Sequence, residues 1–162
     1  MEFVEINILV LLLLFIHELG HVTMAKILGL PIQSIGFQLR PYPHFYVSVK
    51  WPRVNWEKYL YLFSGTFITV SLFCISIYNE FFHITQLYWA FVIQLIIETN
   101  PFYSDFTIAI VSRNKPNNKE RSFPENYKLQ FKKYKFTLKW YVHFMIWTII
   151  ILLLIKFKKI LS

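Results

Sequence analysis

Residues 8–21 decide the fold of this chain: Ile-Leu-Val-Leu-Leu-Leu-Leu-Phe-Ile-His-Glu-Leu-Gly-His. A run of apolar residues leads directly into the pattern H-E-x-x-H, formed by His17, Glu18 and His21. On a helix, the two histidines lie one turn apart on the same face, so both imidazoles can reach one metal ion. Glu18 lies beside them, where its carboxylate can take a proton from a metal-bound water. The stretch therefore predicts a helix at membrane depth that carries two zinc ligands and a general base.

The composition around this stretch indicates a membrane protein. Of the 162 residues, 56% are hydrophobic and 20% aromatic, which is more apolar surface than a soluble domain of this size could bury. The net charge of +8 comes mostly from segments 31–58 and 112–139, as is typical of cytoplasmic loops. Nucleic-acid binding is disfavoured, because no nucleic-acid-binding fold or stacking platform is recognisable. The single cysteine, Cys74, excludes an internal disulfide and a cysteine-rich metal site.

The hydrophobic pattern predicts an all-α membrane protein of about four transmembrane helices, in one polytopic domain over residues 1–162. We expect spans at about 4–28, 59–78, 84–111 and 140–155, the third broken at Pro101. Partial alternation over 35–39 and 45–51 predicts a small membrane-associated β-hairpin after the first span. Segment 112–139 is expected to be a basic cytoplasmic loop, and Trp140, Tyr141 and Trp147 to be interface anchors.

Charge also predicts the orientation in the membrane. Placing both basic segments in the cytoplasm puts the N-terminus outside, whereas the lysines at 156, 158 and 159 leave the side of the C-terminus open. His21 and Asp105 then lie near the cytoplasmic ends of the first and third spans, at similar depth.

A catalytic zinc site needs a third protein ligand. Asp105 is the sole aspartate of the chain and follows the helix break at Pro101, where a short side chain can turn toward a neighbouring span. Glu98 is the competing carboxylate, and it could instead orient a ligand histidine from behind. We favour Asp105 and leave Glu98 open. The remaining histidines, at 44, 83 and 143, are not assigned to the metal.

These motifs resemble the site-2 protease family of intramembrane zinc metalloproteases. The family has a core of three spans, with the two histidines and the glutamate on one span and an aspartate on another. Asn100-Pro101 followed by Ser104-Asp105-Phe106 stands where members have an Asn/Pro stretch and a Leu-Asp-Gly-type motif, with Phe106 in place of the glycine. The hairpin and Ser64-Gly65 are also similar to family features. The resemblance covers residues 4–111 and suggests a compact member without a soluble regulatory domain.

The resemblance implies hydrolysis of peptide bonds in membrane-embedded or membrane-associated substrates. One Zn²⁺ would be held by His17, His21 and Asp105, with Glu18 as the general base. Asn100 is a candidate hydrogen-bond donor to the substrate or the oxyanion. The partners would be a peptide substrate and the lipid bilayer, and the compact size suits a bacterial cytoplasmic membrane with the site toward the cytoplasm.

Two other functions remain open from the sequence. One is a catalytically inactive membrane protein of the same fold that binds a peptide or a partner protein. The other is a metal-handling membrane protein that uses the histidine pair. The intact Glu18 argues against the first, and the apolar second and fourth spans argue against the second.

Overall fold

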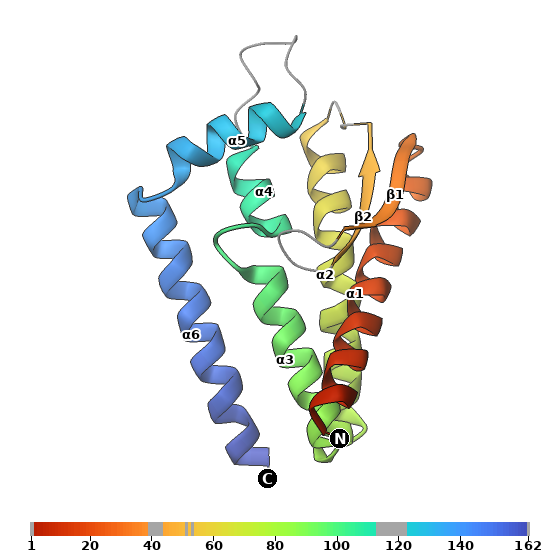
Figure 1. Ribbon diagram of the computed structural model, residues 1–162, viewed down its shortest axis with the longest axis vertical. Helices are drawn as coiled ribbons and strands as arrows, with labels where there is room; N and C mark the ends of the chain where they lie inside the picture. The colour runs from red at the N-terminus through yellow and green to blue at the C-terminus, as the bar shows by residue number, and fades with distance from the viewer. Residues whose placement is uncertain (1, 39–43, 51, 53, 113–122, 162) are drawn as a thin grey trace.

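The computed structural model describes residues 2–38, 44–50, 52, 54–112 and 123–161. These residues form six α-helices, one 3₁₀ turn and one β-hairpin, as Figure 1 shows. The predicted mostly helical architecture with a hairpin after the first helix is confirmed. The elements in chain order are α1 (Glu2–Ile27), β1 (Ile32–Gln38), β2 (His44–Val49), α2 (Asn55–Tyr78), η1 (Phe81–His83), α3 (Thr85–Thr99), α4 (Asp105–Val111), α5 (Phe123–Tyr134) and α6 (Leu138–Leu161).

Helix α1 is a continuous apolar rod that ends at a glycine. At 1.5 Å per residue its 26 residues extend about 39 Å, enough to cross a hydrocarbon core of ~30 Å. Gly29 follows in the left-handed conformation, with φ of 64°. The N–H groups of Gly29 and Leu30 then donate to the carbonyls of Lys26 and Ala25, which closes the helix end.

The hairpin folds back along α1. Strands β1 and β2 are antiparallel, with Ile35 opposite Val47 and Phe37 opposite Phe45. The ring of Phe45 also meets Phe15 of α1 edge-on, with ring centroids 5.6 Å apart. The predicted turn between the strands includes residues 39–43, which lie outside the described residues.

The third predicted span is divided into two short helices. Helix α3 has 15 residues and α4 has seven, and residues 100–104 form an irregular connection between them. Among the described residues, three helices are long and apolar enough to cross a membrane alone: α1, α2 and α6. The sequence expectation of about four spans therefore becomes three continuous helices plus the divided pair α3–α4.

Segment 112–139 is not simply a loop, because it contains the 12-residue helix α5. Helix α5 crosses the end of the bundle and leads into α6 (Figure 1). Val111, Tyr134 and Trp140 form a small buried cluster that joins α4, α5 and α6.

Two larger clusters hold the rest of the bundle together. One packs α1 against α2 and α3 through side chains that include Leu13, Phe73 and Phe91. The other joins the end of α1 to β2, α2 and α4 through side chains that include Ala25, Val49 and Leu62. Many large apolar side chains on α1 and α6 stay exposed, as expected for surfaces that face lipid.

The hairpin and α5 lie at one end of the molecule, and both termini lie at the other (Figure 1). The described parts of the two basic segments therefore lie at one end, as the charge pattern predicts for the cytoplasmic side.

Candidate metal centre

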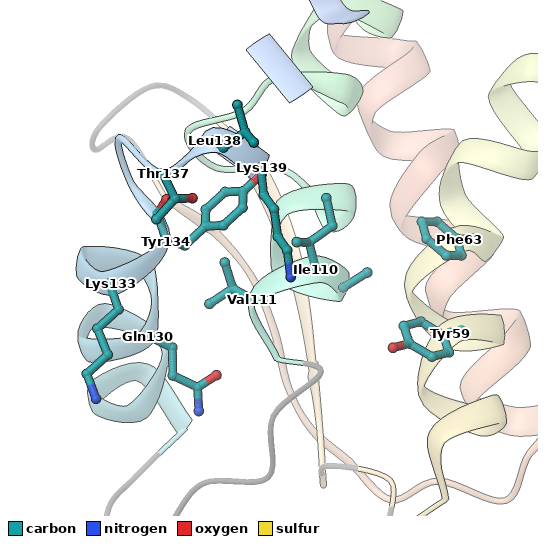
Figure 2. A pocket seen from close by; sticks show the side chains of 11 residues that line it. Tyr59, Phe63, Ile110, Val111, Gln130, Lys133, Tyr134, Thr137, Leu138 and Lys139 are labelled. Carbon is teal, nitrogen blue, oxygen red and sulfur yellow. The ribbon is translucent and has the colours of Figure 1, made fainter. Parts of the chain in front are cut away.

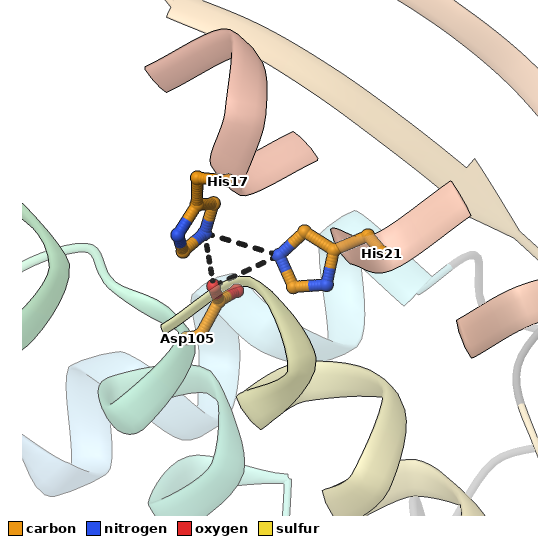
Figure 3. A group of neighbouring side chains, drawn as sticks. All are labelled: His17, His21 and Asp105. Atoms are coloured by element: carbon orange, nitrogen blue, oxygen red, sulfur yellow. Dashed lines mark hydrogen bonds and ion pairs between the residues drawn. The ribbon is translucent and has the colours of Figure 1, made fainter. Parts of the chain in front are cut away.

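The structure brings together two histidines of α1 and an aspartate 84 positions further along the chain. His17 and His21 are buried on one face of α1, and Asp105 is the first residue of α4. Oδ2 of Asp105 lies 3.0 Å from Nε2 of His17 and 3.1 Å from Nε2 of His21, and the two Nε2 atoms are 3.1 Å apart. Figure 3 shows the three side chains pointing at one another. This group could hold a metal ion.

The other nitrogen of each imidazole has its own buried partner. Nδ1 of His21 lies 2.8 Å from the backbone carbonyl of Tyr61, and Nδ1 of His17 lies 2.8 Å from Oε1 of Glu98. A carbonyl oxygen only accepts hydrogen bonds, so Nδ1 of His21 carries a proton. The Glu98 carboxylate accepts from Thr69 and Gln94 as well, and it is an acceptor toward His17.

This arrangement leaves electron-pair donors facing one another. With Nδ1 protonated on each ring, the two Nε2 atoms and the Asp105 carboxylate face one another as potential metal ligands, and without a metal ion a proton on an Nε2 atom would make the hydrogen bond to Oδ2 of Asp105. Three such groups at 3.0–3.1 Å from one another need a shared positive charge, which can be a proton on one imidazole or a metal ion. Ligands about 2.0–2.1 Å from a tetrahedral zinc ion lie about 3.3 Å apart, so the donor set and its spacing fit zinc. The carboxylate and carbonyl behind the two rings are the outer partners that metal-binding histidines usually have.

Two glycines allow α2 to approach this face of α1. A β-carbon on Gly20 would lie 2.9 Å from the Cα atom of Gly65 and 2.9 Å from the carbonyl oxygen of Ser64. A β-carbon on Gly65 would lie only 2.6 Å from Nε2 of His17. The two helices are therefore in backbone contact, and the His17 ring occupies the space that a side chain on residue 65 would need.

The position of Asp105 depends on the turn between α3 and α4. Pro101 has no N–H to offer the carbonyl of Ile97, and the side-chain amide of Asn100 donates to that carbonyl instead. Oδ1 of Asn100 accepts from the N–H groups of Phe102 and Tyr103. The hydroxyl of Ser104 then accepts from the N–H of Thr107 and caps α4, which leaves Asp105 as the first helical residue.

Asn100 therefore has a structural task in this turn. Its amide group donates to two backbone carbonyls, those of Ile97 and Tyr103, and its side-chain oxygen accepts from two backbone N–H groups. A contact from Asn100 to a substrate or an oxyanion stays a prediction, and it would require some of these bonds to be given up.

Glu98 lies behind the site. Its carboxylate contacts the ring nitrogen of His17 that faces away from Asp105, and it is not one of the three converging groups. Of the two carboxylates that compete for the third ligand position, the geometry favours Asp105.

Glu18 lies on the hairpin side of α1. It is half-buried, interacts electrostatically with both imidazoles and with Asp105, and accepts a hydrogen bond from the backbone N–H of Val47 in β2. The carbonyl of the same Val47 accepts from the Tyr61 hydroxyl at 2.7 Å. The edge of β2 that does not pair with β1 therefore lies next to the predicted general base, and at Val47 it is bonded to Glu18 and Tyr61.

Sequence reasoning missed several of these supporting residues. Thr69 and Gln94 are fully buried and both donate to Glu98, yet Thr69 is one of several small polar residues of α2, Gln94 stands alone in an apolar run, and neither belongs to a local motif. Tyr61 was likewise not recognised, although its carbonyl contacts His21 and its hydroxyl contacts the hairpin. A polar residue inside a predicted span is the signal that could have found Thr69 and Gln94.

A pocket of about 770 Å³ lies on another side of α4, bordered by α2, α5 and α6. Figure 2 shows Lys139 extending toward Ile110, whereas Lys133 points away. Its walls are mainly apolar, and none of the predicted site residues lines it.

Comparison of the chain with models of known protein families, with curated proteins and with solved structures finds no match. The likeness to site-2 proteases therefore rests on the motifs and on the geometry of the His-His-Asp group.

Proposed function

We propose that this protein is an intramembrane zinc metalloendopeptidase. The observation that carries the proposal is the convergence of Nε2 of His17, Nε2 of His21 and Oδ2 of Asp105 next to Glu18. Two of the three ligands and the glutamate come from a helix long and apolar enough to cross a membrane. Ionisable groups at that depth are costly and normally mark a functional site.

In this proposal each residue has a defined role. His17, His21 and Asp105 hold one zinc ion, which when bound supplies Lewis acidity that activates water and polarises a peptide carbonyl. Glu18 takes the proton of the attacking water and passes it to the leaving amine. The outer partners Glu98 and the Tyr61 carbonyl keep Nδ1 of each ring protonated, so that Nε2 stays free for the metal.

The hairpin next to Glu18 supports a peptide as the substrate. A transmembrane helix hides its backbone carbonyls, so a substrate must unwind before hydrolysis. An unwound segment could be held as an added strand along a hairpin edge, because main-chain hydrogen bonds require no particular side chains. We therefore propose membrane-embedded or membrane-associated peptides as substrates and the lipid bilayer as the surroundings, with a bacterial cytoplasmic membrane as the location.

Replacing the general base tests the proposal. The full chain is purified in nanodiscs, loaded with zinc and assayed with transmembrane peptides that contain helix-breaking residues. Glu18→Gln should keep one zinc per chain and lose at least about a hundredfold in cleavage rate, because general-base catalysis contributes 10²–10⁴-fold. The matched control is Glu5→Gln, an exposed glutamate on the same helix, which should leave the rate unchanged.

The outcomes also separate the other two functions. A wild-type chain that binds zinc and a peptide without cleaving it would indicate a peptide-binding protein of the same fold. Zinc movement across the bilayer without cleavage would indicate metal handling. Cleavage that persists in the Glu18→Gln protein would refute the role of Glu18.

A further inference from the structure

Helix α6 presents a row of ring N–H donors to the break between α3 and α4. Trp147 donates from Nε1 to the carbonyl of Ile96 at 3.0 Å. His143 contacts the carbonyl of Thr99 from Nε2 at 3.0 Å, and Trp140 donates from Nε1 to the carbonyl of Pro101 at 3.2 Å. Residues 140, 143 and 147 lie on one face of a helix. We call Trp140, His143 and Trp147 the donor row.

The carbonyls that the donor row meets belong to a region where the helical pattern fails. Helix α3 ends at Thr99, and the carbonyls of its last turn have no further helical N–H to accept from. The N–H groups of Phe102 and Tyr103 do not donate to the carbonyls of Glu98 and Thr99, as they would in a continuous helix. They donate to the side chain of Asn100 instead. Irregular backbone at membrane depth is tolerated only where protein groups satisfy it.

His143, the middle residue of the donor row, also forms a hydrogen bond with a residue of α5. Since the Thr99 carbonyl only accepts, Nε2 of His143 carries the proton, and Nδ1 of the neutral ring accepts from the Tyr134 hydroxyl at 3.1 Å. Burial raises the pKa of the Tyr134 phenol, which keeps it protonated as a donor. A continuous chain of hydrogen bonds therefore runs from α5 through α6 to the end of α3.

The break is also packed against α6. The ring of Phe102 lies 5.8 Å from Trp140 and 6.4 Å from Phe144, edge-on to both. Only Tyr103 and Ser104 separate Phe102 from Asp105, and Ser104 caps the helix that Asp105 begins. Fixing the path of residues 99–102 therefore fixes where α4 starts and where the Asp105 carboxylate points.

We propose that α6 is a positioning helix for the metal centre, which acts by holding the α3–α4 break through the donor row and thereby placing Asp105 against His17 and His21. This inference rests on the proposed zinc site. It assigns a task to a helix that lies outside the core implied by the family resemblance. Trp140, His143 and Trp147 are positioning residues and touch no reacting atom.

The test removes the ring N–H groups and keeps an aromatic ring at each position. A triple variant, Trp140→Phe with His143→Phe and Trp147→Phe, is made in the full chain together with the three single variants. Zinc affinity is measured by competition with a chromophoric chelator, and the site geometry is followed by the visible spectrum of bound Co²⁺. Both readouts are independent of proteolysis.

The triple variant should still bind one metal ion, about 10- to 100-fold more weakly, with a changed Co²⁺ spectrum, because loss of outer partners typically costs that much affinity. The single variants should each lose a few-fold, which keeps the test valid should the triple variant fail to fold. His143→Gln, whose amide can still donate to Thr99, should recover most of the loss seen with His143→Phe. The matched control is Tyr141→Phe with Met145→Leu on the exposed face of α6, which should bind zinc like the wild type.

Folded single and triple variants with wild-type affinity and spectrum would overturn the inference. A wild-type chain that binds zinc but cleaves no peptide would contradict the protease proposal alone, since the affinity comparison still holds. A wild-type chain that binds no zinc would refute both.

Discussion

Two histidine sites lie on the two faces of the α3–α4 break, and they differ in which ring nitrogens donate and which accept hydrogen bonds. At the first, His17 and His21 have protonated Nδ1 atoms with partners, and their Nε2 lone pairs face the Asp105 carboxylate. At the second, His143 accepts from Tyr134 on one nitrogen and donates to Thr99 on the other. The second site is complete with neutral protein groups alone, whereas the first brings together three potential metal ligands whose close approach requires a bound metal ion or an extra proton on an imidazole.

The difference shows how to tell a binding histidine from a structural one. Burial differs between the two sites, since His17 and His21 are buried and His143 is only partly buried, but burial alone does not say what a ring binds. The balance of donors and acceptors around both ring nitrogens does separate them. A chemical perturbation should therefore affect the two sites in different ways.

Metal removal should have the largest effect, and only at the first site. Stripping zinc with a chelator should abolish peptide cleavage and lower the thermal unfolding midpoint, since a ligand at about 100 times its Kd stabilises a fold by about 2.7 kcal/mol. The measurement is thermal unfolding of the full chain before and after chelation, with zinc re-addition. The control is His21→Ala, which lacks a ligand and should show no chelator effect. An equal effect of the chelator on both proteins would contradict a metal centre at His17, His21 and Asp105.

Gly65→Ala should come next in size. The new β-carbon would lie 2.6 Å from Nε2 of His17, so the ring or helix α2 must move. We expect zinc affinity to fall by more than the roughly 10- to 100-fold that loss of an outer partner typically costs, because the ligand ring itself is displaced, while the donor row on α6 is untouched. Competition with a chelator measures the loss. Ser71→Ala on the same helix, whose hydroxyl contacts only the carbonyl of Phe67, is the matched control.

Glu98→Gln should have the smallest effect of the three. The neutral amide can still accept from Nδ1 of His17, but it no longer strengthens the basicity of the ring. Zinc affinity should fall about 10- to 100-fold, with one ion still bound. Glu80→Gln, an exposed glutamate in the connection between α2 and α3, is the control. A complete loss of zinc from the Glu98→Gln protein would indicate that Glu98 is itself a ligand.

The parts of the fold that sequence could predict are those with local patterns. The H-E-x-x-H spacing placed His17 and His21 on one face of a helix, and Pro101 located the break that precedes Asp105. The alternation before and after the hairpin turn predicted two strands, although the strands begin earlier than expected. The joint position of the histidines and Asp105 also followed from their similar depth along separate spans.

Helix α5 was not predicted, because the many basic residues of its segment drew attention away from the helical spacing of its aromatic residues. Basic residues dominate segment 112–139, which favoured a loop, yet the aromatic residues at 123, 127, 131 and 134 recur at helical spacing. Of these, Phe131 and Tyr134 pack in the cluster that joins α5 to α4 and α6.

The tryptophans of α6 make contacts that the sequence did not predict. Trp140 and Trp147 were expected at the membrane interface, as aromatic residues near span ends usually are. Trp140 is instead 6% exposed, and both rings donate inward, whereas Tyr141 is half exposed. Their partners are backbone carbonyls of a distant segment, and no sequence motif marks a carbonyl that lacks a helical donor.

Backbone contact through Gly20 and Gly65 also limits the route by which a bulky peptide can reach the site. At this point the backbones of α1 and α2 are in contact, and the ring of His17 lies directly against Gly65 of α2. Separating the two helices here would therefore disturb the position of the His17 ring. The hairpin contacts α1, and α6 contacts the α3–α4 break, partly through aromatic side chains. Such side chains can change rotamer while the three candidate ligands stay in place. In the proposed protease, a peptide substrate should therefore enter along one of those contacts, and cross-linking α1 to α2 near the glycines should leave the cleavage rate unchanged.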